Sequence, residues 1–260
     1  MTALDVRDYI DFDFAVDAKL AAKPKIGLIV LATDYTIEPE IGAAFAASGV
    51  EVHAARIAMD PEVTPQTLAA MGPRITETTE LLLPGDRLDV VGYGCTSASI
   101  VLGEDAVAAA VHAVQPGARV TTPITAAFAA FRALSARRIA VLTPYTRAVN
   151  ERLQAYIEAA GFEVPIFGSF NEPMDPVVAT ISRDSIRGGI VRLTEKRDVD
   201  MVFVSCTSMR FADQIAETEA EIGLPVTTSN HALGWHMLHL AGIPLAADGS
   251  RLYAAALHDH

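Results

Sequence analysis

The sequence predicts an α/β protein made of two similar lobes, each a small parallel sheet flanked by helices. From residue 25 onward, short apolar runs rich in β-branched residues alternate with longer, alanine-rich segments of helical character. This alternation is typical of parallel sheets whose strands are joined by crossover helices. The two halves of the chain also repeat the same phrases in the same order, which indicates a duplicated unit.

Eight runs have the composition and length of strands. They are residues 25–31, 50–57, 88–94, 118–123, 137–144, 162–169, 199–205 and 224–229. Helices are expected between them, at residues 37–48, 64–82, 103–115, 125–135, 146–160, 176–196, 209–222 and 230–241. Glycine follows several of these segments, as expected where a helix ends in a left-handed turn, at Gly49, Gly161, Gly223 and Gly242.

Three landmarks recur in the two halves. Asp34 follows the first strand of one half and Tyr145 the first strand of the other, and each lies 61 positions before a cysteine, Cys95 or Cys206. Both cysteines belong to a strand followed by Cys-Thr-Ser, in "VVGYGCTSAS" and "MVFVSCTSMR". A "VTT" phrase then follows each cysteine, after 25 residues in the first half and 20 in the second. Three ordered matches favour duplication over coincidence.

The repeat also sets the expected domains. We predict a first lobe of residues 22–122 plus 226–260 and a second lobe of residues 123–225, with the tail crossing back to complete the first. The lobes would be Rossmann-like and related by a pseudo-twofold axis. Because ligands of open parallel sheets bind beyond the carboxyl ends of the strands, the active site is expected in the cleft between the lobes.

The charge balance narrows the class of partner. The chain has 20 Lys and Arg against 32 Asp and Glu, a formal net charge of −12. An overall negative field repels phosphate, so we expect binding to neither nucleic acid nor anionic membranes. A small anionic substrate remains compatible with this charge, because local backbone amides act against the net field.

The sequence predicts a cytoplasmic protein. The first twenty residues are acidic and lack a basic segment followed by an apolar block, as a signal peptide would have. No apolar run reaches the roughly 18 residues of a membrane-spanning helix. The 2 cysteines form no disulfide framework, which suits a reducing compartment. A structural disulfide between Cys95 and Cys206 is the alternative.

The two Cys-Thr-Ser phrases combine a thiol with groups that can bind a carboxylate. A thiol placed after a strand and before a helix is exposed to helix amides, which lower the thiol pKa and favour the thiolate. The hydroxyls and backbone amides that follow each cysteine would hold a carboxylate there, from Thr96, Ser97, Thr207 and Ser208. A lone cysteine in this place is more often a small buried hydrophobe, but two matching phrases favour a functional pair on opposite walls of one cleft.

These residues resemble a known family. The paired pattern of strand, cysteine and threonine resembles the aspartate/glutamate racemase superfamily, and "GYGCTSAS", "TPYT" and "SCTSMR" are most similar to its maleate cis-trans isomerase and arylmalonate decarboxylase branch. Within that branch, "LIVLATDYTIEPE", "VVGYGCTSASIVLGEDAV", "AVLTPYT" and "SNHALGWHMLHLAGI" resemble the ectoine-utilisation protein A group. The resemblance extends from residue 25 to about residue 243.

The resemblance implies a cofactor-independent enzyme that uses thiols as acids, bases or nucleophiles in an interdomain cleft. Cys95 and Cys206 match the two catalytic positions, and the presence of both favours an isomerase or racemase over a decarboxylase, which keeps only the second. Four residues match family positions that bind the substrate carboxylate: Thr96, Ser97, Thr207 and Tyr145. A homo-oligomer, dimer or tetramer, is also implied.

The chain departs from this pattern at two positions. Maleate isomerases usually carry asparagine after the first strand, where this chain has Asp34, and after the sixth strand, where it has "NEPMDPVVATIS" with Asp175. An aspartate repels a carboxylate that an asparagine amide would bind. These residues would suit a substrate with a cationic or amide nitrogen, as in ectoine-derived diamino acids. Asp34 acting only as a cap for the next helix is the alternative.

The remaining polar candidates are few. Asn230 and His231 follow a strand and are candidates for the wall of the cleft, and Asn230 is included among the predicted substrate-binding residues. His231, His236 and His239 lack acidic partners at metal-ligand spacing, so no metal is predicted. Arg210 would hold a second carboxylate or neutralise Asp213.

The leading hypothesis is a cofactor-independent isomerase or racemase acting on a small carboxylate: an amino acid, an ectoine derivative or a dicarboxylic acid. One thiolate would remove an α-proton while the opposing thiol returns one, or Cys95 would add to a double bond while Cys206 manages the proton. Maleate isomerase and an arylmalonate-type decarboxylase are alternatives of the same class. A non-catalytic carboxylate-binding protein and a redox protein cycling a Cys95–Cys206 disulfide are alternatives of other classes.

Overall fold

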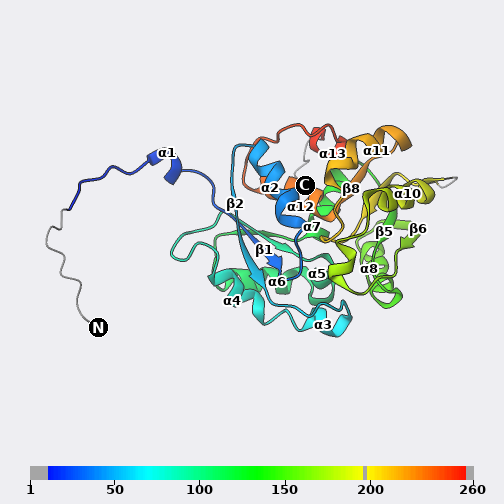
Figure 1. Cartoon of the computed structure of the whole chain (residues 1–260), viewed down its shortest axis with the longest axis horizontal. Coiled ribbons are helices and arrows are strands. Elements are labelled where there is room, and N and C mark those ends of the chain that lie inside the picture. Colours follow the sequence, from blue (N-terminus) through cyan, green and yellow to red (C-terminus); the bar gives the residue numbers. More distant parts are fainter. Residues whose placement is uncertain (1–10, 196–197, 256–260) are drawn as a thin grey trace.

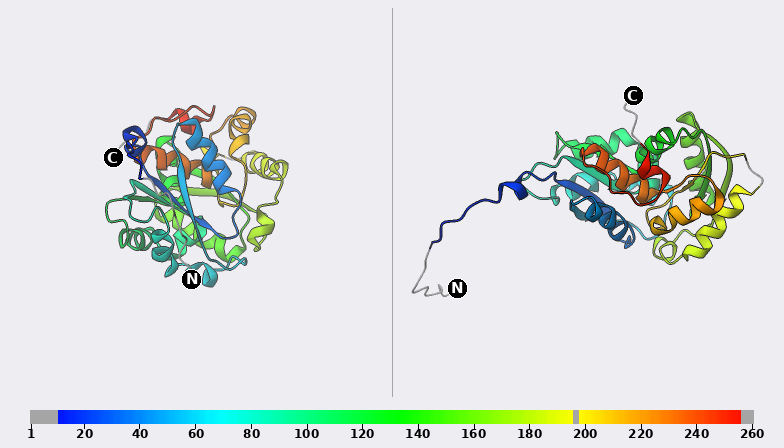
Figure 2. Two further views of the ribbon diagram at one scale, coloured as in Figure 1. Left: turned by 60° about the vertical axis from the view of Figure 1, so that its left-hand side comes forward. Right: turned by 90° about the horizontal axis from the view of Figure 1, so that it is seen from above.

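The computed structural model describes residues 11–195 and 198–255. It shows two α/β lobes side by side, the first mostly blue to green and the second mostly green to orange (Figure 1). Ahead of the first lobe, residues 11–25 form an arm that extends away from the body and carries the short helix α1, Ala18–Ala21 (Figure 2). No helix among the described residues is long and apolar enough to cross a membrane.

The first lobe contains a four-stranded, fully parallel sheet in the order β2-β1-β3-β4. Its strands are β1 (Ile26–Leu31), β2 (Val52–Ile57), β3 (Val90–Gly94) and β4 (Arg119–Thr121). β1 and β3 are buried along their whole length, which explains why their sequences are apolar without alternation.

The second lobe repeats this topology. Its parallel sheet has the order β6-β5-β7-β8, with strands β5 (Arg138–Thr143), β6 (Glu163–Ser169), β7 (Met201–Val204) and β8 (Val226–Thr228). All eight predicted strands are therefore confirmed. The identical strand order confirms the two similar α/β lobes that the repeated phrases predicted.

Helices connect the strands and cover the sheets. In the first half they are α2 (Ile37–Ala47), α3 (Pro65–Ala69), α4 (Arg74–Glu80), α5 (Thr96–Leu102), α6 (Glu104–His112) and α7 (Pro123–Ala133). In the second half they are α8 (Arg147–Ala159), α9 (Asp175–Val178), α10 (Arg183–Thr194), the 3-10 turn η1 (Ala212–Gln214), α11 (Ile215–Ile222), α12 (Ser229–Leu240) and α13 (Arg251–Ala254). The four glycines expected after helices all have positive φ.

Three helix predictions were wrong in detail. The helix expected over residues 64–82 is two helices, because Pro73 begins α4 and cannot continue α3. The helix expected over 176–196 also breaks, because the Ser182 side chain accepts a hydrogen bond from the Ser185 amide and so caps a new helix, α10. Helix α5 was not predicted, since its sequence "TSASIVL" begins with small polar residues.

Two helices cross between the lobes. α7 follows the first sheet, yet its Phe131 packs edge-on against Phe203 of β7 in the second sheet, with ring centroids 5.5 Å apart. α12 follows the second sheet, yet its Met237 packs against Gly92 of β3 in the first. The two helices also pack against each other in the middle of the molecule (Figure 1). This reciprocal exchange holds the lobes, and hence the carboxyl ends of both sheets, in a fixed relation.

The predicted domain boundaries remain a prediction. β8 pairs with β7 of the second sheet, whereas α12, which follows it, packs on the first sheet through a cluster that includes Trp235, Ile37 and Phe45. The strand and the helix after residue 226 thus contact different lobes. Residues 256–260 of the predicted range lie outside the described part of the chain.

Candidate active site

The two cysteines lie at matching places in the two lobes. Cys95 directly follows β3, and Cys206 follows β7 after one intervening residue, so both thiols are at the carboxyl ends of central strands. Both are free thiols and both are buried, with exposed fractions of 3% and 5%. Both thiols are therefore shielded from solvent.

Cys95 is the N-cap of helix α5, which lies closer to the thiol than the helix predicted from residue 103. Its sulfur accepts a hydrogen bond from the Ala98 amide at 3.4 Å and lies 3.8 Å from the Ser97 hydroxyl. The expected thiolate is a wrong prediction, however. Burial raises the pKa of the Cys95 thiol to about 12, and the Ala98 amide and Ser97 hydroxyl offset this only in part. Loss of solvation outweighs the helix end here, so burial favours the protonated thiol.

Cys206 has no helix directly after it, which corrects a second expectation. Residues 207–211 form a turn and a loop, and the next helical element, η1, begins at Ala212. Burial again raises the pKa of the thiol, and the nearby Asp175 carboxylate raises it further. A hydrogen bond from the Tyr145 hydroxyl and the Ser208 amide oppose this rise.

Tyr145 connects the two thiols. It follows β5 in the second lobe and is buried, and its hydroxyl lies near enough to the Cys206 sulfur and to the Ser97 hydroxyl of the first lobe for both to affect its pKa. Since the Ser97 hydroxyl lies 3.8 Å from the Cys95 sulfur, a path of neighbouring side chains runs from Cys95 through Ser97 and Tyr145 to Cys206. Burial raises the pKa of Tyr145 well above its ordinary value, so this hydroxyl remains a donor.

Two buried carboxylates face the same thiols. Asp34, in the turn between β1 and α2, is completely buried, and Asp175, at the start of α9, is 2% exposed. Each raises the pKa of both Cys95 and Cys206. The Asp34 Oδ1 accepts hydrogen bonds from the Thr36 and Ile37 amides at 2.7 and 3.0 Å. The capping role considered from the sequence is thus present for this oxygen.

The predicted carboxylate-binding hydroxyls are engaged within the protein. The Thr96 hydroxyl lies 2.8 Å from that of Ser229, the Thr207 hydroxyl donates to the Gly94 carbonyl at 3.4 Å, and the Ser208 hydroxyl donates to Asp175 at 2.7 Å. These bonds tie the thiol-bearing loops to one another and to the opposite lobe. Substrate binding by these side chains remains a prediction.

Asn230 lies behind the Cys206 loop. Its side-chain amide donates to the Thr207 carbonyl oxygen at 2.7 Å and to Glu40 at 2.8 Å. Glu40 of α2 in turn accepts from the Phe211 and Ala212 amides, both at 2.8 Å. No local pattern marks Glu40, because one acidic residue on a helix resembles any solvated position. Burial raises the pKa of Glu40 to about 7.

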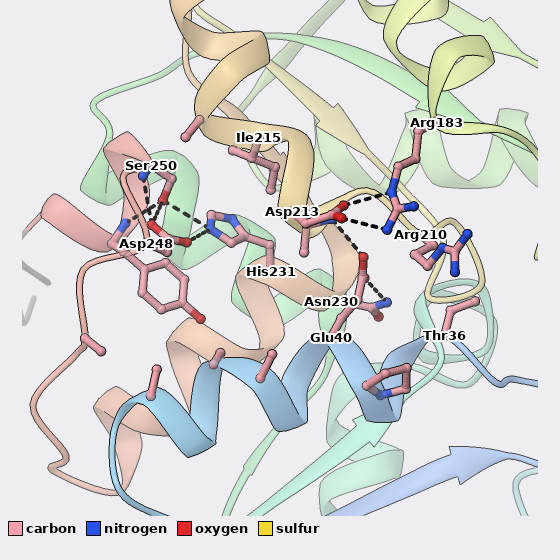
Figure 3. A pocket seen from close by; sticks show the side chains of 18 of the residues that line it. Thr36, Glu40, Arg183, Arg210, Asp213, Ile215, Asn230, His231, Asp248 and Ser250 are labelled. Atoms are coloured by element: carbon pink, nitrogen blue, oxygen red, sulfur yellow. Dashed lines mark hydrogen bonds and ion pairs between the residues drawn. The ribbon is translucent and has the colours of Figure 1, made fainter.

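A pocket of about 560 Å³ opens beside this network. Glu40, Asn230 and Thr36 lie on one side of it, and His231 with Asp248 and Ser250 lies on the other (Figure 3). Neither cysteine lines it. Of the two roles considered for Arg210, neutralisation of Asp213 is not seen, since Asp213 pairs with Arg183 at 2.6 Å, and Arg210 lines the pocket. Among the described residues no cluster of His, Cys, Asp or Glu has the form of a metal site.

Comparisons with known proteins agree with this arrangement. The family profile "Arylmalonate decarboxylase" matches residues 26–253. The maleate isomerase of Nocardia farcinica is 30% identical over 237 residues, which covers 87% of this chain and 93% of the relative. A cysteine-to-alanine variant of the maleate isomerase Iso from Pseudomonas putida S16, solved with maleate, superposes with a TM-score of 0.82 at 26% identity, covering 90% of this chain and 98% of that one.

A further solved relative carries a covalent adduct. It is a cysteine-to-serine variant of the Nocardia farcinica maleate cis-trans isomerase with a covalently bound succinylcysteine intermediate. It superposes with a TM-score of 0.81 at 28% identity, covering 88% of this chain and 98% of that chain.

Proposed function

The chain belongs to the arylmalonate decarboxylase family, within the aspartate/glutamate racemase superfamily, and from that premise we propose that it is a cofactor-independent isomerase or racemase acting on a small carboxylate. Cys95 and Cys206 are the proposed catalytic residues. Tyr145 and the loops that carry Thr96, Ser97, Thr207 and Ser208 would hold the substrate carboxylate.

The observation that carries this proposal is the convergence of both thiols on one tyrosine. The path from Cys95 through Ser97 and Tyr145 to Cys206 joins residues from two lobes. Two buried cysteines that served only for packing would need no shared donor. A substrate carboxylate that takes the place of this internal path would accept from Ser97 and Tyr145 and would lie between the sulfurs.

Proton transfer is the first mechanism that this arrangement supports. One cysteine, as thiolate, removes the proton on the α-carbon, and the electron pair left behind delocalises into the carboxylate held by Tyr145. The opposing thiol then delivers its own proton to the other face of the carbon. The configuration at the α-carbon inverts, and the two thiols exchange protonation states.

Addition to a double bond is the second mechanism. A thiolate forms a C–S bond to one alkene carbon, and the π electrons move to the neighbouring carbon, which takes a proton from the opposing thiol to give a saturated thioether. After rotation about the resulting single bond, the opposing thiolate removes a proton from that carbon, and the C–S bond breaks as the first thiolate leaves and the double bond returns in the opposite geometry. The succinylcysteine intermediate of the Nocardia relative supports this chemistry for a family member.

The substrate itself is a matter of proposal. The resemblance of four phrases to the ectoine-utilisation protein A group favours an ectoine-derived substrate, and the maleate isomerases among the relatives favour a dicarboxylate. An arylmalonate-type decarboxylation and non-catalytic carboxylate binding are the competing activities. A homo-oligomer in the cytoplasm remains the expectation from the sequence.

Proton NMR in deuterated water tests the proposal. Purified protein is incubated in turn with maleate, aspartate, glutamate, phenylmalonate, ectoine, 5-hydroxyectoine and the ring-opened ectoine forms. Conversion or α-deuteration of one compound, lost in Cys95→Ser and Cys206→Ser, is the expected result. Solvent deuterium at the α-carbon would identify proton transfer, whereas an adduct mass on one cysteine would identify addition. Binding of a compound with no change in any sample contradicts catalysis.

A further inference from the structure

Two buried carboxyl groups lie beside the Cys206 loop and are not used by the proposed chemistry. The turn that carries Asp34 contacts this loop through the Thr36 hydroxyl, which donates to the Thr207 carbonyl oxygen at 2.5 Å, and Asp175 accepts from the Ser208 hydroxyl at 2.7 Å. Among the described residues neither carboxylate forms an ion pair. Buried charges in proteins are normally paired, so this site has a deficit of positive charge.

The two carboxylates differ in how well they are satisfied. Asp175 accepts from the Thr33 hydroxyl on one oxygen, at 2.5 Å, and from the Ser208 hydroxyl on the other, at 2.7 Å. The Asp34 Oδ2, in contrast, is buried and has no hydrogen-bond partner among the described residues. Burial raises the pKa of Asp34, and the nearby Thr207 hydroxyl, which donates to the Gly94 carbonyl at 3.4 Å, offsets this only in part.

Helix capping uses only one of the two carboxylate oxygens of Asp34. The Oδ1 meets the Thr36 and Ile37 amides at the start of α2, a role that asparagine would fill as well. An aspartate adds a second charged oxygen, and burial of that oxygen without a donor is unfavourable. The unpartnered Oδ2 of this completely buried side chain is therefore available to a donor that arrives with the substrate.

We propose that the substrate carries a positively charged nitrogen as well as a carboxylate, and that the Asp34 Oδ2 accepts a hydrogen bond from that nitrogen, with the Asp175 charge behind it. The inference rests on the proposed function, whose substrate class it narrows from small carboxylates to zwitterionic or cationic amino or amidino acids. A dicarboxylate such as maleate would instead bring two more negative charges to a site that already has two.

A cationic nitrogen would also act on the thiols. Without substrate, the two carboxylates oppose ionisation of Cys95 and Cys206. A positive charge placed against Asp34 offsets them, so that a thiolate forms more readily once the substrate is bound. The correct substrate thereby favours the reactive form of the thiol, and the empty enzyme keeps it protonated.

Binding of matched probes tests the inference. Succinate and 4-aminobutanoate have nearly the same length and differ mainly in whether one end is a carboxylate or an ammonium group, and 2,4-diaminobutanoate adds a second ammonium group. Isothermal titration calorimetry on the full chain should show at least tenfold tighter binding of the amino compounds than of succinate. Asp34→Asn should reduce or reverse this ratio by at least tenfold, since it keeps the capping oxygen and removes the charge.

Controls separate charge recognition from folding. Asp86→Asn removes an exposed carboxylate that pairs with Lys25 and should leave the ratio unchanged. Asp34→Asn should unfold at a temperature close to that of the wild type. If it does not fold, Asp175→Asn serves in its place, with the same expected loss of preference for the amino compounds.

The outcomes distinguish the two proposals. Succinate binding as tightly as the amino compounds, failure of the amino compounds to bind at millimolar concentration, or an unchanged ratio in both aspartate variants overturns the cationic-substrate inference. A clear preference for the amino compounds without conversion of any compound in the NMR panel supports the inference and counts against catalysis.

Discussion

The two halves of this chain share one topology but contribute different chemistry to the site. At the position 61 residues before the cysteine, the first half has Asp34 and the second has Tyr145. Asp34 brings a buried carboxyl group that raises the pKa of both thiols, whereas Tyr145 brings a neutral hydroxyl beside Cys206 and Ser97. Duplication thus supplies two equivalent positions beside one cleft, and their divergence gives one wall a place for positive charge and the other a donor for negative charge.

The strands before the two cysteines also differ, in the size of the side chains at matching positions. The 111-residue offset that relates Cys95 to Cys206 also relates Gly94 of β3 to Ser205, and Gly92 to Phe203 of β7. Phe203 fills the space over its sheet and contacts Phe131. Gly92 leaves that space to Met237 of the crossing helix α12. The first sheet therefore needs glycines where the second uses larger side chains.

Tyr145→Phe tests the chemical difference and should have the largest effect. Removing the hydroxyl breaks the path between the thiols and removes a donor for the developing negative charge, so kcat/KM should fall about 100-fold. Steady-state kinetics on the converted compound measures the loss. Tyr156→Phe is the control, because its hydroxyl contacts Glu104 far from the thiols, and a similar loss there would contradict the assignment.

Gly94→Ala tests the packing difference. A Cβ at this position would lie 2.7 Å from Ile37 Cδ1 and 2.9 Å from the Ile29 carbonyl oxygen. Because the second contact is with backbone, the variant should lose about 2–3 kcal/mol of unfolding free energy. Urea unfolding monitored by circular dichroism measures this loss. A stability equal to that of the wild type would contradict the close packing of α2 on β3.

Glu40→Gln tests the contact between α2 of the first half and the Cys206 loop of the second. Burial raises the pKa of Glu40 from its ordinary value of 4.5 to about 7. The folded protein thus holds this proton more tightly than the unfolded chain, and the stability it contributes below pH 4.5 is lost as the pH rises toward 7.

The glutamine variant has no such proton. Between pH 4.5 and pH 7.5 its unfolding free energy should gain about 2 kcal/mol relative to the wild type, after allowance for partial exposure. Urea titrations at several pH values measure this trend. The more exposed Glu38→Gln on the same helix is the control. A relative change of the opposite sign would contradict the burial of the Glu40 carboxylate.

Ser205→Ala is the counterpart of Gly94→Ala and should have the smallest effect. The Ser205 hydroxyl is buried and has no hydrogen-bond partner among the described residues. The alanine variant lacks this unsatisfied hydroxyl group, so its unfolding free energy should stay within about 0.5 kcal/mol of the wild-type value or rise slightly. A loss as large as that of Gly94→Ala would remove the contrast between the two strands.

The sequence predicted best what depends on local composition. Buried parallel strands are continuous apolar runs, and for this reason all eight were found. The breaks at Pro73 and Ser182 were present in the sequence but were overridden by the helical character of the residues around them. Helix α5 was not predicted, because part of its N-terminal capping comes from the sulfur of Cys95, which is an unusual cap.

The site was predicted where the repeat marked it. The cysteines and Tyr145 could be found from matched spacing and family resemblance, and the structure places them together. The raised pKa of the thiols could not be predicted, because the effect of burial on the thiol pKa exceeds that of the helix end only in the folded protein. Glu40 and the unpartnered oxygen of Asp34 depend on contacts between residues far apart in the chain, which no local pattern indicates.

The central claim is that two halves of the chain supply two thiols to one reaction. The most direct test compares kcat for Cys95→Ser, Cys206→Ser and the double variant on the compound that the wild type converts. Groups that act as a unit give non-additive losses, so each single change should lower kcat by roughly 10³-fold and the double variant should lose no more. Full activity in either single variant, or losses that multiply in the double variant, would contradict a shared site.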